Sequence, residues 1–217
     1  MALAEREGER ILKGIPASVG VCCGKILVLG KSNDDLPSHT IDEMEVPREL
    51  ELFEKALIQT RQQVLEIQRR VEEGMGAKDA AIFDAHLLVL EDQTLIDEVS
   101  RLIQEQKLNG AKAFHNVAEK YAATLGAMDD EYLHERAADI RDVMTRVLGH
   151  LRNCPQESDL RHLMEPCLVI SHDLAPSTTA LLDRKMVLGF ATDIGSKTSH
   201  TAIMARAMHI PAVVGLR

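Results

Sequence analysis

Residues 195–215 read GSKTSHTAIMARAMHIPAVVG, and this stretch decides the fold class of the 217-residue chain. A loop of small and polar residues leads into HTAIMARAM at 200–208, which has the pattern of an amphipathic helix. The apolar run IPAVVG at 210–215 is typical of a strand. A loop, a helix and a strand in this order predict that the C-terminal part of the chain is α/β.

Further strand patterns lie on both sides of a long helical region. CLVISHD at 167–173 and MVLGFATD at 186–193 are buried-strand patterns, and residues 11–30 show short β-rich runs broken by glycine. Since the first and last parts of the chain share this character, we expect them to form one discontinuous α/β domain. Its predicted parts are residues 1–43 and 153–217.

The middle of the chain, residues 44–152, has the pattern of a helical bundle. Apolar residues recur three and four positions apart along five segments, with Thr60 filling one place in the first series. The predicted helices run from about 46 to the glycines at 74 and 76, and then over 77–90, 92–106, 111–125 and 131–151. Short loops between such helices predict an up-and-down bundle. The expected fold class is therefore α/β plus all-α, with the bundle inserted into the α/β domain.

The charge of the chain is concentrated in this bundle. Residues 42–152 contain 23 acidic and 14 basic side chains, which accounts for the whole net charge of −9. Nucleic acid is excluded as a partner because phosphate backbones attract Lys and Arg. The balance favours a basic protein partner, although a merely solvated acidic helix surface gives the same composition.

The composition also bears on where the chain works. No run reaches the ~18 apolar residues of a membrane span, and the charged start MALAEREGERIL lacks the apolar core of a secretory signal. The four cysteines have no CxxC spacing and include the adjacent pair Cys22 and Cys23. Reduced thiols in a cytoplasmic protein without membrane insertion are the expectation.

His200 stands at the first turn of the helix predicted in the opening stretch. Backbone N–H groups and the positive end of the helix dipole make such a turn an anion site. Thr198 or Ser199 can cap the helix, and Lys197 adds a cation. A neutral imidazole there is nucleophilic near pH 7 and can carry a phosphoryl group reversibly. A capped helix with a surface histidine remains the alternative, and no spacing typical of a metal site occurs in the chain.

Five stretches spread over the chain from Gly14 share a pattern with one known family. They are TSHTAIMAR with IPAVVG, GIPASVGVCCGK, AAIFDAHLLVLED, DDEYLHERAADIRDV and DLAPSTTALL. Together they resemble Enzyme I, the phosphoenolpyruvate-protein phosphotransferases of the bacterial sugar phosphotransferase system. The histidine segment alone also fits pyruvate phosphate dikinase and phosphoenolpyruvate synthase, whereas the helical stretches favour Enzyme I. The resemblance implies a swivelling phosphohistidine domain with an inserted helical subdomain at 44–152.

The resemblance also implies roles for particular residues. His200 would take phosphate from phosphoenolpyruvate on Nε2 and pass it to a histidine of the carrier protein HPr, supported by Gly195, Lys197, Thr198 and Ser199. Thr179 matches a family threonine whose hydroxyl bonds the active histidine, although an ordinary helix hydroxyl is the alternative. The positions that match HPr contacts are Ala81, His86, Leu88, Leu95, Leu125, Leu133 and Arg136. Ala81, Leu88 and Leu95 would share one face if their helices run on, while Leu125 and Leu133 also suit the bundle core.

The chain departs from the family pattern at two residues, and it lacks the C-terminal barrel of the family. Ser196 stands where the family usually has Gly, and Lys197 where it has Arg. The family continues into a C-terminal barrel that binds phosphoenolpyruvate and Mg²⁺ and forms the homodimer. We therefore expect a monomeric part without a cofactor of its own, charged by phospho-HPr but not by phosphoenolpyruvate alone. The mobile domain of a dikinase-like enzyme and a non-catalytic acidic docking module are the alternatives.

Overall fold

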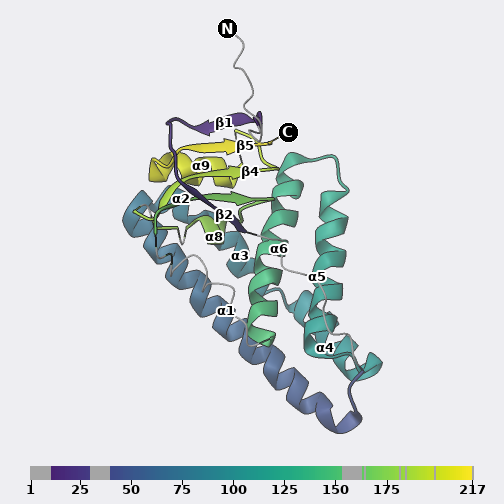
Figure 1. The fold of residues 1–217 in the computed structure, drawn as a ribbon. Helices are drawn as coiled ribbons and strands as arrows, with labels where there is room; N and C mark the ends of the chain where they lie inside the picture. Colours follow the sequence, from purple (N-terminus) through teal and green to yellow (C-terminus); the bar gives the residue numbers. More distant parts are fainter. Residues whose placement is uncertain are drawn as a thin grey trace. The chain divides into compact units, whose positions relative to one another are not determined.

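The computed structural model describes residues 11–29, 40–152, 163, 165–180, 182–183, 185–197 and 199–216 (Figure 1). The predicted site residue Thr198 lies outside these residues. The described residues form two compact units. One holds the residues up to 29, those within 163–174 and those from 182 onward, and the other holds 40–152 and 175–180. The predicted division assigns 175–180 to the α/β domain instead.

The α/β unit contains a five-stranded mixed sheet with the order β1-β5-β4-β3-β2. Its strands are β1 (Ile15–Ser18), β2 (Lys25–Leu29), β3 (Cys167–Ser171), β4 (Val187–Thr192) and β5 (Ala212–Val214). β1 pairs antiparallel with β5, and the other neighbours are parallel. The first and last parts of the chain therefore share one sheet, as the strand patterns predict.

The helix α9 (His200–Met208) packs in this unit beside β1 and β5. Val169, Phe190 and Ala212 lie opposite one another on adjacent strands and are all buried. The buried residues of α9 include Ala202, which is fully buried. Apolar side chains from the sheet and the helix thus form the core, and its burial stabilises the connection from β4 to α9.

The helical unit contains most of the predicted helices with nearly the predicted bounds. After the short 3-10 helix η1 (Glu43–Glu45), they are α1 (Val46–Met75), α2 (Ala77–Ala80), α3 (Ile82–Leu90), α4 (Gln93–Gln106), α5 (Gly110–Gly126) and α6 (Glu131–Leu151). The unit also includes α8 (Pro176–Thr179). α5 and α6 lie side by side, and α1 packs along α6 and α3 (Figure 1). The prediction of a bundle inserted between the strands is confirmed.

Local chemistry explains where these helices begin and end. Asp92, Asn109 and Asp130 cap α4, α5 and α6 through their side-chain oxygens. α1 runs through Gly74 and ends at Gly76, whose φ of +104° suits a residue without Cβ. Thr60 is buried in the apolar series of α1, where its hydroxyl donates to Ala56 O at 2.8 Å.

The structure differs from the sequence prediction around residues 77–92. The predicted helix 77–90 is divided at Ala81, and a new helix starts only after Asp92. Asp92 accepts hydrogen bonds from the backbone N–H of Thr94 (2.8 Å) and Leu95 (3.1 Å). Because this cap belongs to a new helix, α3 and α4 do not present one continuous face.

Candidate active site

His200 is the first residue of α9, in the connection that leaves β4. Ser199 is the N-cap, and its side chain accepts a hydrogen bond from Ala202 N at 3.4 Å. The same hydroxyl donates to Ser196 O at 2.9 Å, which closes the turn before the helix. The imidazole of His200 is half-buried. The structure thus places this histidine at a capped helix start, as the pattern of residue types predicts.

The loop before His200 is held by its backbone. Gly195 has φ of +129°, and a Cβ there would lie 3.1 Å from Val214 Cβ, so the position requires glycine. The guanidinium of Arg206 donates to Lys197 O (3.0 Å) and to Ala17 O (3.1 Å), which ties the loop to β1. The side chain of Lys197 itself is exposed. The predicted loop residues other than Thr198 therefore lie together around the start of α9.

A histidine–carboxylate pair that the sequence reasoning missed lies in the same unit. His172 follows β3 and Asp193 follows β4, and Nδ1 of the ring lies 3.1 Å from Oδ2 of the carboxylate. Both side chains are about half exposed. Two polar residues that directly follow adjacent parallel strands were the available signal, because such strand ends share one edge of the sheet.

The first turn of α9 is anchored to this edge through Thr201. Its hydroxyl donates to Leu174 O at 2.7 Å, and the side chain is almost completely buried. Backbone bonds from Asp193 N to Ser171 O and from Ile194 N to His172 O join the two strand ends. His200 is thus carried by a rigid framework of loops, which suits a nucleophile that needs a fixed backbone.

Thr179 lies at the end of α8, in the helical unit rather than in the unit of His200. Its side chain is buried, and its hydroxyl donates to Ala175 O at 3.0 Å. Because the hydroxyl proton is used in this bond, the oxygen retains lone pairs that can accept a hydrogen bond. The predicted bond between Thr179 and His200 stays a prediction.

Five of the seven residues predicted to meet HPr have exposed or half-exposed side chains. Ala81 and Leu88 are exposed, the latter by 69%, and Leu125 and Leu133 are half-buried. Arg136 lies 4.7 Å from the ring centroid of Tyr132 and pairs with Asp139 at 3.2 Å. This Arg136 side chain is partly exposed, so its guanidinium is accessible at the surface of α6.

The other two predicted contacts, His86 and Leu95, are wrong as surface residues. His86 is completely buried and Leu95 is 2% exposed. The predicted face of Ala81, Leu88 and Leu95 required one continuous helix, but the cap at Asp92 begins a new helix whose Leu95 points into the core. His86 lies on the inner side of α3, where its ring bonds to a carboxylate of α6.

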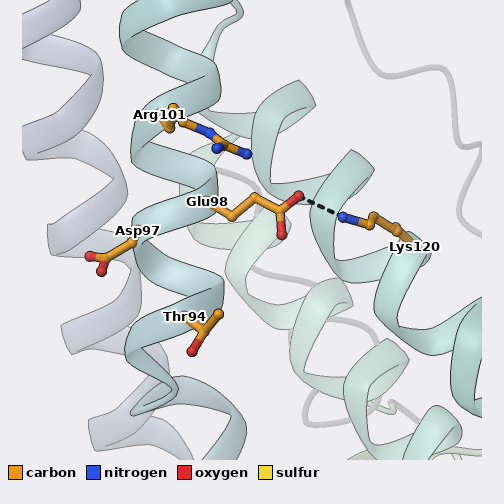
Figure 2. Close-up of a pocket in the computed structure, with 5 residues that line it drawn as sticks. All are labelled: Thr94, Asp97, Glu98, Arg101 and Lys120. Atoms are coloured by element: carbon orange, nitrogen blue, oxygen red, sulfur yellow. Dashed lines mark hydrogen bonds and ion pairs between the residues drawn. The ribbon is translucent and has the colours of Figure 1, made fainter.

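A groove lies on the helical unit. Figure 2 shows it between α4 and α5, lined by Thr94, Asp97, Glu98, Arg101 and Lys120. Lys120 Nζ pairs with Glu98 Oε1 at 2.8 Å, and this hydrogen bond lowers the pKa of Glu98 below its ordinary value. With carboxylates and cations side by side, the groove has no excess charge to attract an anion.

Comparison with known proteins supports the assignment of the family and of the fold. The family model described as "PEP-utilising enzyme, N-terminal" matches residues 13–136, and "PEP-utilising enzyme, mobile domain" matches residues 163–217. A solved structure of Enzyme I, determined by NMR, has a TM-score of 0.74 and 40% identity, and the match covers 94% of this chain and 82% of that one. This chain belongs to the Enzyme I family of PEP-utilising enzymes.

Two further matches place the chain within the Enzyme I family. The phosphoenolpyruvate-protein phosphotransferase of Bacillus sp. (strain S) is 41% identical over 96% of this chain. The chain spans about a third (36%) of the length of that relative. A solved "N-terminal domain of Enzyme 1 - Nitrogen" has a TM-score of 0.67 at 26% identity, covering 95% of this chain and 84% of that one.

Two properties of the described part of this Enzyme I chain bear on what it can bind. No helix there combines the length and the apolar character needed to cross a bilayer. No group of three or more His, Cys, Asp or Glu side chains that could hold a metal ion occurs within the described ranges. The Mg²⁺ that the family implies therefore finds no set of donors among these described residues.

Proposed function

We propose that His200 is the phosphoryl carrier of this Enzyme I. It would receive phosphate from phosphoenolpyruvate, through the part of the family's length that this chain does not span, and would pass it to HPr. The observation that carries the proposal is the position of the half-buried imidazole in the first turn of α9, behind the Ser199 cap. An N-terminal helix turn stabilises a phosphoryl dianion through its free N–H groups and its dipole.

The exchange with HPr is an in-line displacement between two histidines. A ring nitrogen of His200 attacks phosphorus with its lone pair, the P–N bond to the carrier histidine breaks, and the leaving imidazole keeps that electron pair. No proton transfer is required when each phosphorylated ring keeps the proton on its other nitrogen: the attacking neutral imidazole then becomes a phosphoimidazolium, and the carrier's phosphoimidazolium leaves as a neutral imidazole. The protein needs only to align the three atoms and hold the equatorial oxygens with N–H and hydroxyl donors.

Thr179 would set which nitrogen reacts. Its hydroxyl proton is engaged by Ala175 O, so toward an imidazole its oxygen can act only as an acceptor. An imidazole that donates Nδ1–H to this oxygen keeps the lone pair on Nε2, the atom that carries phosphate in the family. An acceptor at Thr179 is compatible with phosphorylation on Nε2, the atom that the family resemblance implies.

The helical unit would dock the carrier. It holds the whole net charge of −9 within residues 42–152, and a basic surface would meet it with complementary charge. Leu88 and Ala81 offer apolar contact, and Arg136 offers a partly exposed guanidinium. We propose Leu125 and Leu133 as contacts at the edge of the same surface. The identities of 40% to Enzyme I and 26% to the nitrogen-related domain favour the sugar branch.

The proposed setting is the cytoplasm, and the complete protein is proposed to be a homodimer whose remaining part binds phosphoenolpyruvate and Mg²⁺. The exposed Cys22 and Cys23 are free thiols, which suits a reducing compartment. No nucleic acid partner is proposed, since the charge of the helical unit is acidic.

One experiment tests the function. The chain is mixed with ³²P-phospho-HPr and, separately, with ³²P-phosphoenolpyruvate and Mg²⁺, and label on the chain is followed. Label from phospho-HPr, no label from phosphoenolpyruvate and no label on His200→Ala are expected. His209→Asn is the matched control, because His209 is an exposed histidine at the other end of α9 with a left-handed φ of +53° that Asn tolerates.

The other outcomes identify the alternatives. Phosphorylation of this chain by phosphoenolpyruvate alone would contradict the proposal that phosphoenolpyruvate acts through the part of the family's length that this chain does not span. Binding of HPr without any transfer would favour a docking module. Label that survives His200→Ala but disappears in another histidine variant would move the carrier role to that residue.

A further inference from the structure

We propose that Asp142, together with His86 and Arg146, is a positioning residue for phosphoryl transfer because it fixes the segment 175–180 that carries Thr179. The inference rests on the proposed function, in which Thr179 orients the imidazole of His200. All the contacts that carry it lie within the helical unit.

Asp142 on α6 holds the start of α8 through both of its carboxylate oxygens. Ser177 N donates to Oδ2 at 3.2 Å, and the Ser177 hydroxyl donates to Oδ1. The N-cap residue of α8 is Ala175, which has no side chain able to cap. A carboxylate from a helix 35 residues away in sequence therefore supplies the acceptor that a local Ser, Thr, Asp or Asn usually supplies.

His86 on α3 holds Asp142 from the other side. Nε2 lies 3.1 Å from Asp142 Oδ2, and Nδ1 lies 3.2 Å from Ile82 O. Both partners are acceptors, so both ring nitrogens must carry protons, and the buried ring is an imidazolium. The result is a buried ion pair in which the aspartate is oriented toward Ser177.

Arg146, one turn further along α6, completes the group. Its Nε donates to Ser177 Oγ at 2.9 Å and lies 3.7 Å from Asp142 Oδ1. Ser177 is completely buried, and the side chain of Arg146 is 8% exposed. The serine hydroxyl is thus fixed between a carboxylate that accepts its proton and a guanidinium that donates to its oxygen.

The pKa values agree with this ionic description. Burial alone would raise the pKa of Asp142, but hydrogen bonding and charge from His86, with Arg146 and Ser177, lower it to about 2. Burial alone would lower the pKa of His86, but the bond to Asp142 and the charges of Asp142 and Asp139 outweigh it and raise this pKa.

The segment that is held has little structure of its own. α8 is a single turn of four residues, and isolated turns of this length are unstable in water. Thr179 comes two residues after Ser177, and its hydroxyl direction is set by a bond to Ala175 O within the same turn. The orientation of the threonine oxygen therefore depends on the attachment of Ser177 to Asp142.

Stability alone does not account for this arrangement. Apolar residues of similar volume can replace buried ion pairs without loss of stability, whereas a buried polar group with all its partners imposes one geometry. Ser177 is fixed by three hydrogen bonds to Asp142 and Arg146, and such fixation suits a segment in which the direction of the Thr179 hydroxyl, two residues away, affects the reaction.

The test compares Asp142→Asn with the intact chain in single-turnover transfer from phospho-HPr. Asn keeps the size and one acceptor but cannot pair with the imidazolium. The maximal transfer rate should fall by about tenfold while the half-saturating concentration of phospho-HPr is unchanged, as a misplaced orienting group predicts. Asp183→Asn, an exposed aspartate of the α/β unit, is the matched control and should transfer at the normal rate.

A double-variant cycle shows whether the effect passes through Thr179. In a Thr179→Val background, Asp142→Asn should lower the rate by less than about twofold, because coupled residues are not additive. A normal rate for Asp142→Asn, a change confined to half-saturation, or the full tenfold loss in both backgrounds would each overturn the inference.

Hydrogen exchange separates this inference from the proposed function. The amides of Ser177 and Thr179 should exchange faster in Asp142→Asn, whereas those of α5 should not change; unchanged exchange at Ser177 would overturn the inference whether or not His200 takes label. Should Asp142→Asn fail to fold, Ser177→Ala removes the hydroxyl bonds to Asp142 and Arg146, leaves the bond from the backbone N–H, and is followed by the same two readouts. If the intact chain itself takes no label from phospho-HPr, it is the proposed function that fails.

Discussion

Two side chains, His86 and Asp142, link the charge state of the protein to its stability. They lie 3.1 Å apart in the interior of the helical unit, and each favours the charged form of the other. His86 also faces Asp139, and Asp142 also faces Arg146 and Ser177. The pair is therefore more stable as ions than as neutral groups, despite its burial.

The raised pKa of His86 predicts a loss of stability in alkali. The contribution of the imidazolium is fully present below the unfolded pKa of about 6.5 and is lost as the pH rises through the higher folded pKa. For Asp142 the contribution is present above the unfolded value of 3.8 and is lost only as the pH falls through about 2. Urea unfolding between pH 5.5 and 9 should show a decline that His86→Gln abolishes and the control His209→Asn retains.

The N-cap of α9, Ser199, is expected to contribute to the stability of the protein. Ser199→Ala removes the acceptor for Ala202 N and the bond to Ser196 O, and should lower the free energy of unfolding by about 0.5–2 kcal/mol. Ser199→Thr keeps the hydroxyl and should remain near the original stability. Equal stability of the alanine and threonine variants in urea titrations would show that the cap contributes nothing.

The helix elements depend on single residues at their ends, and the end of α1 shows this clearly. Gly74 is exposed within the helix and has open space around its Cα, whereas Gly76 follows the helix with φ of +104°. The two glycines are only two residues apart, yet their backbones require different residues.

Alanine at these two positions should therefore have opposite effects. Gly74→Ala should raise the free energy of unfolding by about 0.5–1 kcal/mol, because helix formation costs alanine less entropy than glycine. Gly76→Ala should lower it by about 1–3 kcal/mol through backbone strain, since no neighbouring atom obstructs the new methyl group. Thermal unfolding of the two variants measures both, and a destabilised Gly74→Ala would contradict the assigned helix end.

The break between α3 and α4 predicts different effects for two leucines. Leu88 is 69% exposed, so Leu88→Ala should leave stability nearly unchanged and weaken HPr binding by about tenfold. Leu95 is buried, so Leu95→Ala should cost about 2–5 kcal/mol of stability instead. Calorimetric titration measures HPr binding and urea unfolding measures stability for both variants. A Leu95→Ala variant that is stable but binds HPr more weakly would show that Leu95 is a surface contact after all.

The sequence predicted those helices and strands whose pattern of residue types lies within the element itself. The apolar periodicities and the strand patterns gave element positions within a few residues, and the first turn of α9 followed from Ser199 and His200. The burial of His86 was not predictable, because its partner lies 56 residues away on another helix. The pair of His172 and Asp193 was also missed, although both residues directly follow predicted strands, because the pairing of those two strands is a contact between elements that periodicity does not reveal.

At the scale of the molecule, charge is divided between the two parts of the chain. Residues 42–152 contain an excess of nine acidic side chains, while the remainder is neutral. Long-range attraction to a basic carrier therefore belongs to the helical unit, while the residues of the α/β unit perform the proposed chemistry.

Binding of HPr should consequently weaken with salt. The Debye length falls from about 10 Å at 0.1 M to about 3 Å at 1 M, so attraction between the acidic helices and a basic surface is progressively screened. Raising NaCl from 50 to 500 mM should weaken binding by about tenfold, mainly through a slower association rate. Stopped-flow measurements test this, and an association rate independent of salt would contradict electrostatic docking.

The strand order has a consequence for the way the protein is made. β1, near the start of the chain, pairs only with β5, which the ribosome produces about 200 residues later. At roughly 5–20 residues per second, this strand waits about 10–40 s for its partner. The helices of residues 46–151 emerge in that interval and can fold on their own local contacts. Synthesis thus finishes the helices of residues 46–151 first, and the sheet of the unit that contains His200 is completed only when β5 emerges.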